Sequence, residues 1–144
     1  MKMIPIAEHP GHAQILWDLL AEREPSASIS HRKMPTMGEH LAFVEKMDPD
    51  NGHLYDRYMI WDLIEVDGRI VGSIYLTQDD EIGISIFKAH QRKGYATAAI
   101  KKLMVECMVG PFYANVAPTN TASRAMFEKL GFKVIQQTLM LEAE

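Results

Sequence analysis

The sequence has few of the features that mark several common protein classes. It contains a single cysteine, Cys107, so it has no intrachain disulfide, and we expect this thiol to be a small buried hydrophobe in a reducing compartment. No apolar run approaches membrane-spanning length, and no signal-like apolar stretch occurs near the N-terminus. We therefore expect a cytoplasmic protein with no membrane partner.

The sequence also has no excess of positive charge and no metal-ligand pattern. The formal net charge is −4, which argues against a general nucleic-acid binder, so no nucleic-acid partner is expected. The six histidines show no paired spacing on one helix face, and we expect no metal. A chain of 144 residues can bury a core without disulfides or metal, and we expect one domain over residues 1–144.

A short basic loop is the strongest local signal that is present. Gln91-Arg92-Lys93-Gly94-Tyr95-Ala96 follows an apolar run at 82–87 and opens an amphipathic helix. The first N–H groups of a helix have no partner within it and carry partial positive charge, so a phosphate or pyrophosphate would fit there. The Walker A and three-glycine dinucleotide patterns are both absent. The loop alone leaves two alternatives, a phosphate site or a simple turn built on Gly94.

Hydrophobic periodicity and turn residues predict the remaining elements. Pro5 places the first strand at a sheet edge, and Asp67-Gly68 indicates a hairpin. The order is β-α-α-β-β-β-α-β-α-β, an α+β fold in which helices flank a mixed, mostly antiparallel sheet. Strands are expected at residues 2–7, 58–65, 69–76, 81–87, 112–116 and 133–141. Helices are expected at 11–23, from the Thr36-Met37-Gly38-Glu39 capping box to 48, from 96 to the Gly110-Pro111 pair, and at 120–130.

Three short motifs occur along the chain in a consistent order and spacing. They are the strand at 81–86, the loop at 91–96, and Asn120-Thr121-Ala122-Ser123 followed by Phe127 and Leu130-Gly131-Phe132. Together with the element order, they resemble the GNAT-type N-acetyltransferase family, whose signature loop reads Q/R-x-x-G-x-G/A. The resemblance covers nearly the whole chain and implies a GNAT-like fold that binds acetyl-CoA as acyl donor.

The resemblance also implies which residues hold the donor. Backbone N–H groups from Arg92 to Thr97 would hold the pyrophosphate, and the pantetheine arm would run along the strand at 84–86. Asn120 would hydrogen-bond this arm, cap the last helix, or do both. The implied donor-binding residues are Ile84, Ser85, Ile86, Gln91, Arg92, Lys93, Gly94, Tyr95, Ala96, Thr97 and Asn120.

The implied reaction is direct acyl transfer from a thioester to a primary amine. Such an amine has a pKa near 10, so a base must remove its proton. Many family members carry a tyrosine as the general acid where this chain has Phe127, and some use a serine at the position of Ser123. Ser123 is therefore our candidate to protonate or hydrogen-bond the sulfur. The alternative for Ser123 is an ordinary helix serine. A fifth-strand glutamate is replaced by Asn115, leaving Glu81 as candidate base or as a solvated strand-end residue.

The acceptor is the least specified part of the sequence. In the family that the chain resembles, the loop between the first two helices helps to build the acceptor site. Here that loop carries His31 and Arg32, which would contact the acceptor or remain solvated. Asn115 is a further candidate for contact with the acceptor. We expect a small-molecule amine, with amino sugars among the candidates. The alternatives are a protein or peptide amine, or a non-catalytic acyl-CoA sensor. Monomer and homodimer both remain open, since the last strand would pair across a dimer or pack in the core.

Overall fold

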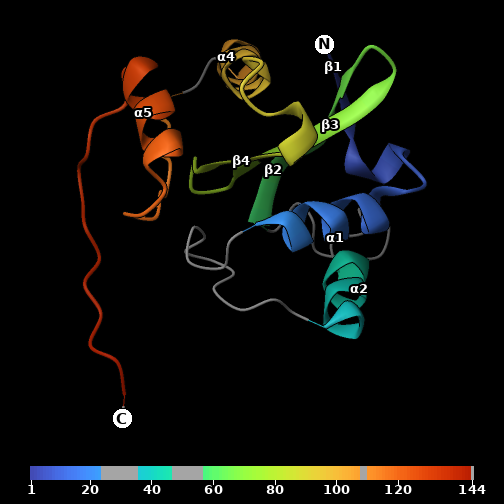
Figure 1. Ribbon diagram of the computed structural model, residues 1–144, viewed down its shortest axis with the longest axis horizontal. Coiled ribbons are helices and arrows are strands. Elements are labelled where there is room, and N and C mark those ends of the chain that lie inside the picture. Colours follow the sequence, from blue (N-terminus) through green and yellow to red (C-terminus); the bar gives the residue numbers. More distant parts are fainter. Residues whose placement is uncertain (24–35, 47–56, 108–109, 144) are drawn as a thin grey trace.

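The structure, a computed structural model, describes residues 1–23, 36–46, 57–107 and 110–143. Its centre is an antiparallel sheet with strand order β1-β2-β3-β4 (Figure 1). The Asp67-Gly68 turn joins β2 to β3 with both residues in the left-handed region, as the hairpin signal predicted. The strands are β1 Lys2–Pro5, β2 Tyr58–Val66, β3 Arg69–Thr77 and β4 Ile82–Ile86.

Strand β1 is shorter than the sequence predicts and lies at a sheet edge. It pairs with β2 alone, with Pro5 opposite Asp62, so the edge position inferred from this proline is confirmed. After Pro5 the chain enters a 3₁₀ turn, Ile6–Glu8, whose Ile6 side chain packs into the core rather than continuing the strand.

Helices cover both faces of the sheet, α4 on one side and α1 with α2 on the other (Figure 1). Neighbouring residues of a strand point to opposite faces, so Ile64 packs toward α4 while Leu63 packs toward α1. One of the two bonds of the predicted capping box is present, because Thr36 Oγ1 accepts from Glu39 N at 3.1 Å. The Glu39 carboxylate accepts from the Thr36 hydroxyl. The helices are α1 His12–Glu22, α2 Met37–Lys46, α4 Tyr95–Cys107 and α5 Thr121–Lys129.

Two predicted strands are not formed, although the α+β class is confirmed. Residues 112–116 make one parallel bridge, between Tyr113 and Glu81, with Ile82 N donating to Tyr113 O at 2.7 Å. Residues 133–141 form no strand and run outward beyond α5 (Figure 1). The apolar pattern of both runs suits a strand, but a strand also needs a neighbouring edge, and neither run has one along its length.

Within the described ranges, no helix is long and apolar enough to cross a membrane. The same residues contain no group of three His, Cys, Asp or Glu side chains placed to hold a metal ion.

Candidate active site

The basic loop joins β4 to α4 through a turn that contains two left-handed residues. After a 3₁₀ turn, Lys88–His90, the residues Arg92 and Gly94 take positive φ values of 64° and 82°. Successive backbone N–H groups in a turn of this kind line a concavity, here called the nest, that suits an anion. Glycine adopts this conformation without strain, whereas Arg92 holds it at a cost of about 1 kcal/mol.

The backbone N–H groups of this loop have no acceptor among the described residues. None of the six N–H groups from Arg92 to Thr97 donates a hydrogen bond to any described residue, and the first contact in α4 runs from Ala98 N to Gly94 O at 3.0 Å. The side chains of Arg92 and Lys93 are exposed beside these donors. The arrangement therefore offers backbone hydrogen bonds, a helix N-terminus and two cations at one place.

Two side chains outside the nest hold the loop in position. The Gln91 amide donates from Nε2 to Ile86 O at 3.0 Å, tying the loop to the end of β4. The Glu22 carboxylate, at the end of α1, accepts from Lys88 N at 3.3 Å. Gln91, predicted to bind the donor, thus has its side-chain amide engaged in shaping the loop.

The outer edge of β4 is open beyond its first residue. Phe87 N bonds to Val71 O and Thr77 N bonds to Glu81 O, so the odd-numbered residues from 81 to 87 direct their backbone groups toward β3. The even-numbered residues direct theirs outward. Ile82 N donates to Tyr113 O, and Ile86 O accepts from Gln91. This leaves Ile82 C=O, both backbone groups of Ile84 and Ile86 N–H without a described partner. Among the residues predicted on this strand, Ser85 has its backbone groups directed to β3.

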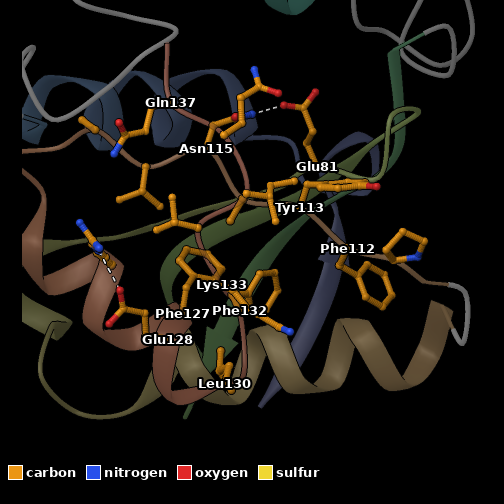
Figure 2. Close-up of a pocket in the computed structure, with 18 of the residues that line it drawn as sticks. Glu81, Phe112, Tyr113, Asn115, Phe127, Glu128, Leu130, Phe132, Lys133 and Gln137 are labelled. Carbon is orange, nitrogen blue, oxygen red and sulfur yellow. Dashed lines mark hydrogen bonds and ion pairs between the residues drawn. The ribbon is translucent and has the colours of Figure 1, made fainter. Parts of the chain in front are cut away.

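Glu81 and Asn115, predicted from separate motifs, lie together. The Asn115 amide donates from Nδ2 to Glu81 Oε2 (Figure 2). The bridge between Glu81 and Tyr113 brings the two segments into register, and Glu81 N donates to Thr77 Oγ1 at 3.1 Å. The other carboxylate oxygen of Glu81 has no hydrogen bond to the described residues. One oxygen therefore orients the carboxylate, and the other is available to a substrate or to water.

Asn120 and Ser123 meet at the start of α5. Asn120 is the N-cap, and its Oδ1 accepts from Ser123 N at 3.2 Å. This engages the side-chain oxygen and leaves the amide nitrogen without a hydrogen bond to the described residues. The Ser123 hydroxyl is half-buried and likewise forms no hydrogen bond there. Phe127, which stands where the resemblance implies a tyrosine acid, is buried with its ring 5.0 Å from that of Phe132, so it packs rather than donates.

Sequence reasoning missed Tyr75. Its ring lies so close to Gly83 that an added Cβ there would overlap it, and its phenol is close enough to Glu81 to feel that charge. Burial, the largest cause, raises the pKa of Tyr75. Its ring packs against Tyr58 and Trp61 at centroid distances of 5.2 and 5.6 Å. A glycine inside the apolar run at 82–87 was the available signal, because such a glycine often marks a close approach. His31 and Arg32 lie outside the described residues.

The fold and this site define the class of protein. A family model described as the Acetyltransferase (GNAT) family matches residues 14–132, so the chain belongs to that family, as its motifs predicted. It is an acyltransferase of the acetyl-CoA-dependent N-acetyltransferase class. A search of curated proteins finds no match.

Solved structures show the same fold at low sequence identity. An aminoglycoside 6'-N-acetyltransferase from Acinetobacter haemolyticus is 20% identical with a TM-score of 0.63, over 100% of this chain and 99% of that one. A ribosomal-protein-alanine N-acetyltransferase from Brucella melitensis is 16% identical with a TM-score of 0.63, over 92% and 83%. The Microcin C7 self-immunity acetyltransferase MccE, solved with acetyl-CoA and AMP, is 18% identical with a TM-score of 0.63, over 89% and 75%.

Proposed function

We propose that this N-acetyltransferase moves the acetyl group of acetyl-CoA directly to a primary amine of a small molecule, with amino sugars the first class to test. The observation that carries the proposal is the row of six free backbone N–H groups from Arg92 to Thr97. A pyrophosphate needs such a row at a helix N-terminus. The likeness to MccE, which was solved with acetyl-CoA and AMP, supports the same donor here.

The open edge of β4 supports the placement of the rest of the donor. The free groups of Ile84 and Ile86 point outward between the nest and the bridge at Tyr113, where the amides of a pantetheine arm would pair as an added strand does. Ile82 N–H is already bonded to Tyr113, so Ile84 N–H is the first free outward donor after the bridge. We assign it the role of stabilising negative charge on the thioester oxygen during transfer.

Glu81 and Ser123 are the groups proposed to handle protons. An alkyl ammonium with a pKa near 10 is neutral in roughly one molecule in a thousand at pH 7, so the open oxygen of Glu81, directly or through water, would take its proton. The amine nitrogen then bonds to the acetyl carbon, the carbon–sulfur bond breaks, and the second proton of the nitrogen passes to the departing sulfur. The Ser123 hydroxyl would donate to the departing sulfur, while Asn115 holds the Glu81 carboxylate in place.

The test is release of CoA thiol from acetyl-CoA in the presence of amino sugars, polyamines, amino acids and peptides. Turnover with a small amine supports the proposal. Turnover with peptides alone would replace the small-molecule acceptor by a protein amine, and binding of acetyl-CoA without turnover on any amine would make the chain an acyl-CoA sensor.

A matched pair of variants tests the donor nest directly. In Gly94→Val a β-branched residue must adopt φ near 82°, so the nest should distort and the KM for acetyl-CoA should rise by about tenfold or more. Lys101→Ala, on the exposed side of α4, should leave this KM unchanged. An unchanged KM in Gly94→Val would remove the nest from donor binding.

A further inference from the structure

Three residues form a row across the sheet, on the face that carries α1 and α2. Trp61 of β2 lies opposite Tyr75 of β3, and Tyr75 lies opposite Gly83 of β4. Trp61 and Tyr75 both pack with the core on this face. Because opposite side chains of neighbouring strands are about 5 Å apart, Trp61 limits the room for Tyr75 on one side. Gly83 has no side chain, so the ring of Tyr75 extends over β4 instead.

The phenol end of Tyr75 is the part that lies over Gly83. Of the Tyr75 atoms, the one nearest to a Cβ added at Gly83 is Cζ, the carbon that carries the hydroxyl. The hydroxyl therefore lies where a side chain at position 83 would begin. Tyr58 and Trp61 hold the ring in this direction through edge-on contacts at centroid distances of 5.2 and 5.6 Å. Tyr75 thus belongs to β3 but presents its hydroxyl on β4.

This hydroxyl lies one step along the chain from Glu81. The backbone at Glu81 is already paired with β3, since Thr77 N donates to Glu81 O at 2.9 Å. In an extended chain, residues two apart share a face and lie about 6.6 Å from each other. Position 83, which the Tyr75 hydroxyl occupies, is therefore the next place on the same face after Glu81. The proposed base and a phenol hydroxyl stand side by side.

Tyr75 supplies the accessible polar group of the aromatic cluster. Arg57 hydrogen-bonds the Tyr58 hydroxyl, and Trp61 Nε1 is buried. The Tyr75 side chain is half-buried, and its hydroxyl makes no hydrogen bond to the described residues. Burial is the largest cause that raises the pKa of Tyr75 above its ordinary 10.0. The phenol therefore keeps its proton at neutral pH and can both donate and accept a hydrogen bond.

We propose that Tyr75 selects acceptors that carry a hydroxyl group on the carbon next to the amine-bearing carbon. The amine would lie at Glu81 and the hydroxyl would bond to Tyr75 Oη. The inference rests on the proposed function, and it names the acceptor class as vicinal amino alcohols, to which 2-amino sugars belong. Two hydrogen bonds of about 2.9 Å and the two carbons between amine and hydroxyl bridge a step of ~6.6 Å. Tyr75 determines specificity and moves no proton.

The size of the selection follows from the partial burial of Tyr75. A fully buried hydrogen-bonding group rejects a substrate without its partner very strongly, because the group is left unpaired. The half-buried Tyr75 hydroxyl can turn to water when the acceptor lacks a hydroxyl. One neutral hydrogen bond of this kind is expected to change kcat/KM by about five- to tenfold.

The test compares trans-2-aminocyclohexanol with cyclohexylamine, which have the same ring and amine and differ only in the neighbouring hydroxyl. Wild type should release CoA thiol with a kcat/KM about five- to tenfold higher for the amino alcohol. Tyr75→Phe should lose this preference through a higher KM for the amino alcohol, and its kcat/KM for cyclohexylamine should change by less than about twofold. Its thermal midpoint reports whether the variant is folded.

Tyr58→Phe is the matched control. It makes the same chemical change in the same cluster, but it removes a hydroxyl that Arg57 already binds, so the preference for the amino alcohol should remain. Equal kcat/KM for the two amines in wild type would overturn the inference. A preference that persists in folded Tyr75→Phe would do the same. Both results would leave the proposed acetyl transfer to small amines standing.

A binding experiment separates the two proposals. Thiol release with none of the amines would overturn the proposed function. The inference is then decided by calorimetric titration of the CoA-saturated protein with the same two amines. Tighter binding of trans-2-aminocyclohexanol to wild type, lost in Tyr75→Phe, would support the role of Tyr75. Equal binding of the two amines, or no binding of either, would overturn it.

Discussion

Replacing Asp62 with asparagine is expected to stabilise the protein near neutral pH and to have little effect in acid. Asp62 lies on β2, opposite Pro5 and Ile74. Burial, the largest cause, together with the nearby Glu106 and Glu8 carboxylates, raises the pKa of Asp62 from its ordinary 3.8 to about 6, against the attraction of Lys102.

The sign follows from proton binding. Because the folded carboxyl keeps its proton to a higher pH than the unfolded one, the folded state binds more protons between pH 3.8 and about 6. The contribution of Asp62 to the free energy of unfolding is therefore fully present below pH 3.8 and is lost as the pH rises through about 6. A shift of this size in a fully buried group would be worth about 3 kcal/mol. Since Asp62 is only half-buried, solvent screening reduces the expected cost above pH 6 to about 1 kcal/mol.

Thermal unfolding of the Asp62→Asn variant at about pH 4 and about pH 8 measures this cost. We expect its midpoint to exceed that of wild type by about 3 °C at the higher pH and to match it at the lower one. Asp18→Asn, on the exposed side of α1, is the control and should change neither midpoint. An equal gain at both pH values would show that packing, not charge, is responsible. No gain at about pH 8 would refute the reasoning.

Four further predictions concern the site. Glu81→Gln is expected to lower turnover by about 10²–10⁴-fold with little change in the KM for acetyl-CoA, and a wild-type pH–rate profile would exclude Glu81 as the base. Asn115→Ala keeps the Glu81 carboxylate but removes the donor that orients it, so turnover should fall by about tenfold. Ser123→Ala should lower turnover while calorimetric binding of acetyl-CoA is unchanged, and equal turnover would remove it from the mechanism. Gly83→Ala would place a methyl group against the Tyr75 ring and should lower the free energy of unfolding by about 1–3 kcal/mol. Thermal unfolding measures this loss, and an unchanged midpoint would count against the packing of Tyr75 on Gly83.

Local signals predicted the parts of the fold that depend on near neighbours. The Asp67-Gly68 turn, the Thr36 side-chain cap and the loop at 91–96 each rest on residues a few positions apart, and the structure has all three. The family's motif order then predicted the class correctly. These features need no knowledge of which distant segments meet.

The errors fall where distant segments must find one another. Alternating apolar residues at 112–116 and 133–141 show that a chain suits a strand, but they do not say which edge is free to receive it. The Asn115–Glu81 contact joins two segments through the bridge at Tyr113, and no sequence spacing encodes that pairing. The position of Tyr75 over Gly83 likewise depends on the register of β3 against β4.

The single parallel bridge between Glu81 and Tyr113 has a consequence for the order of folding. Strands β2, β3 and β4 follow one another through short turns, so their antiparallel pairing closes only small loops. Tyr113 joins from beyond α4, which requires closing a much longer loop before any contact compensates for it. We therefore expect the three-stranded meander to form first and the outer edge of β4 to acquire its neighbour last. Pulse-labelling during refolding would then find the Ile82 amide, which bonds to Tyr113 O, protected later than the amides of β3.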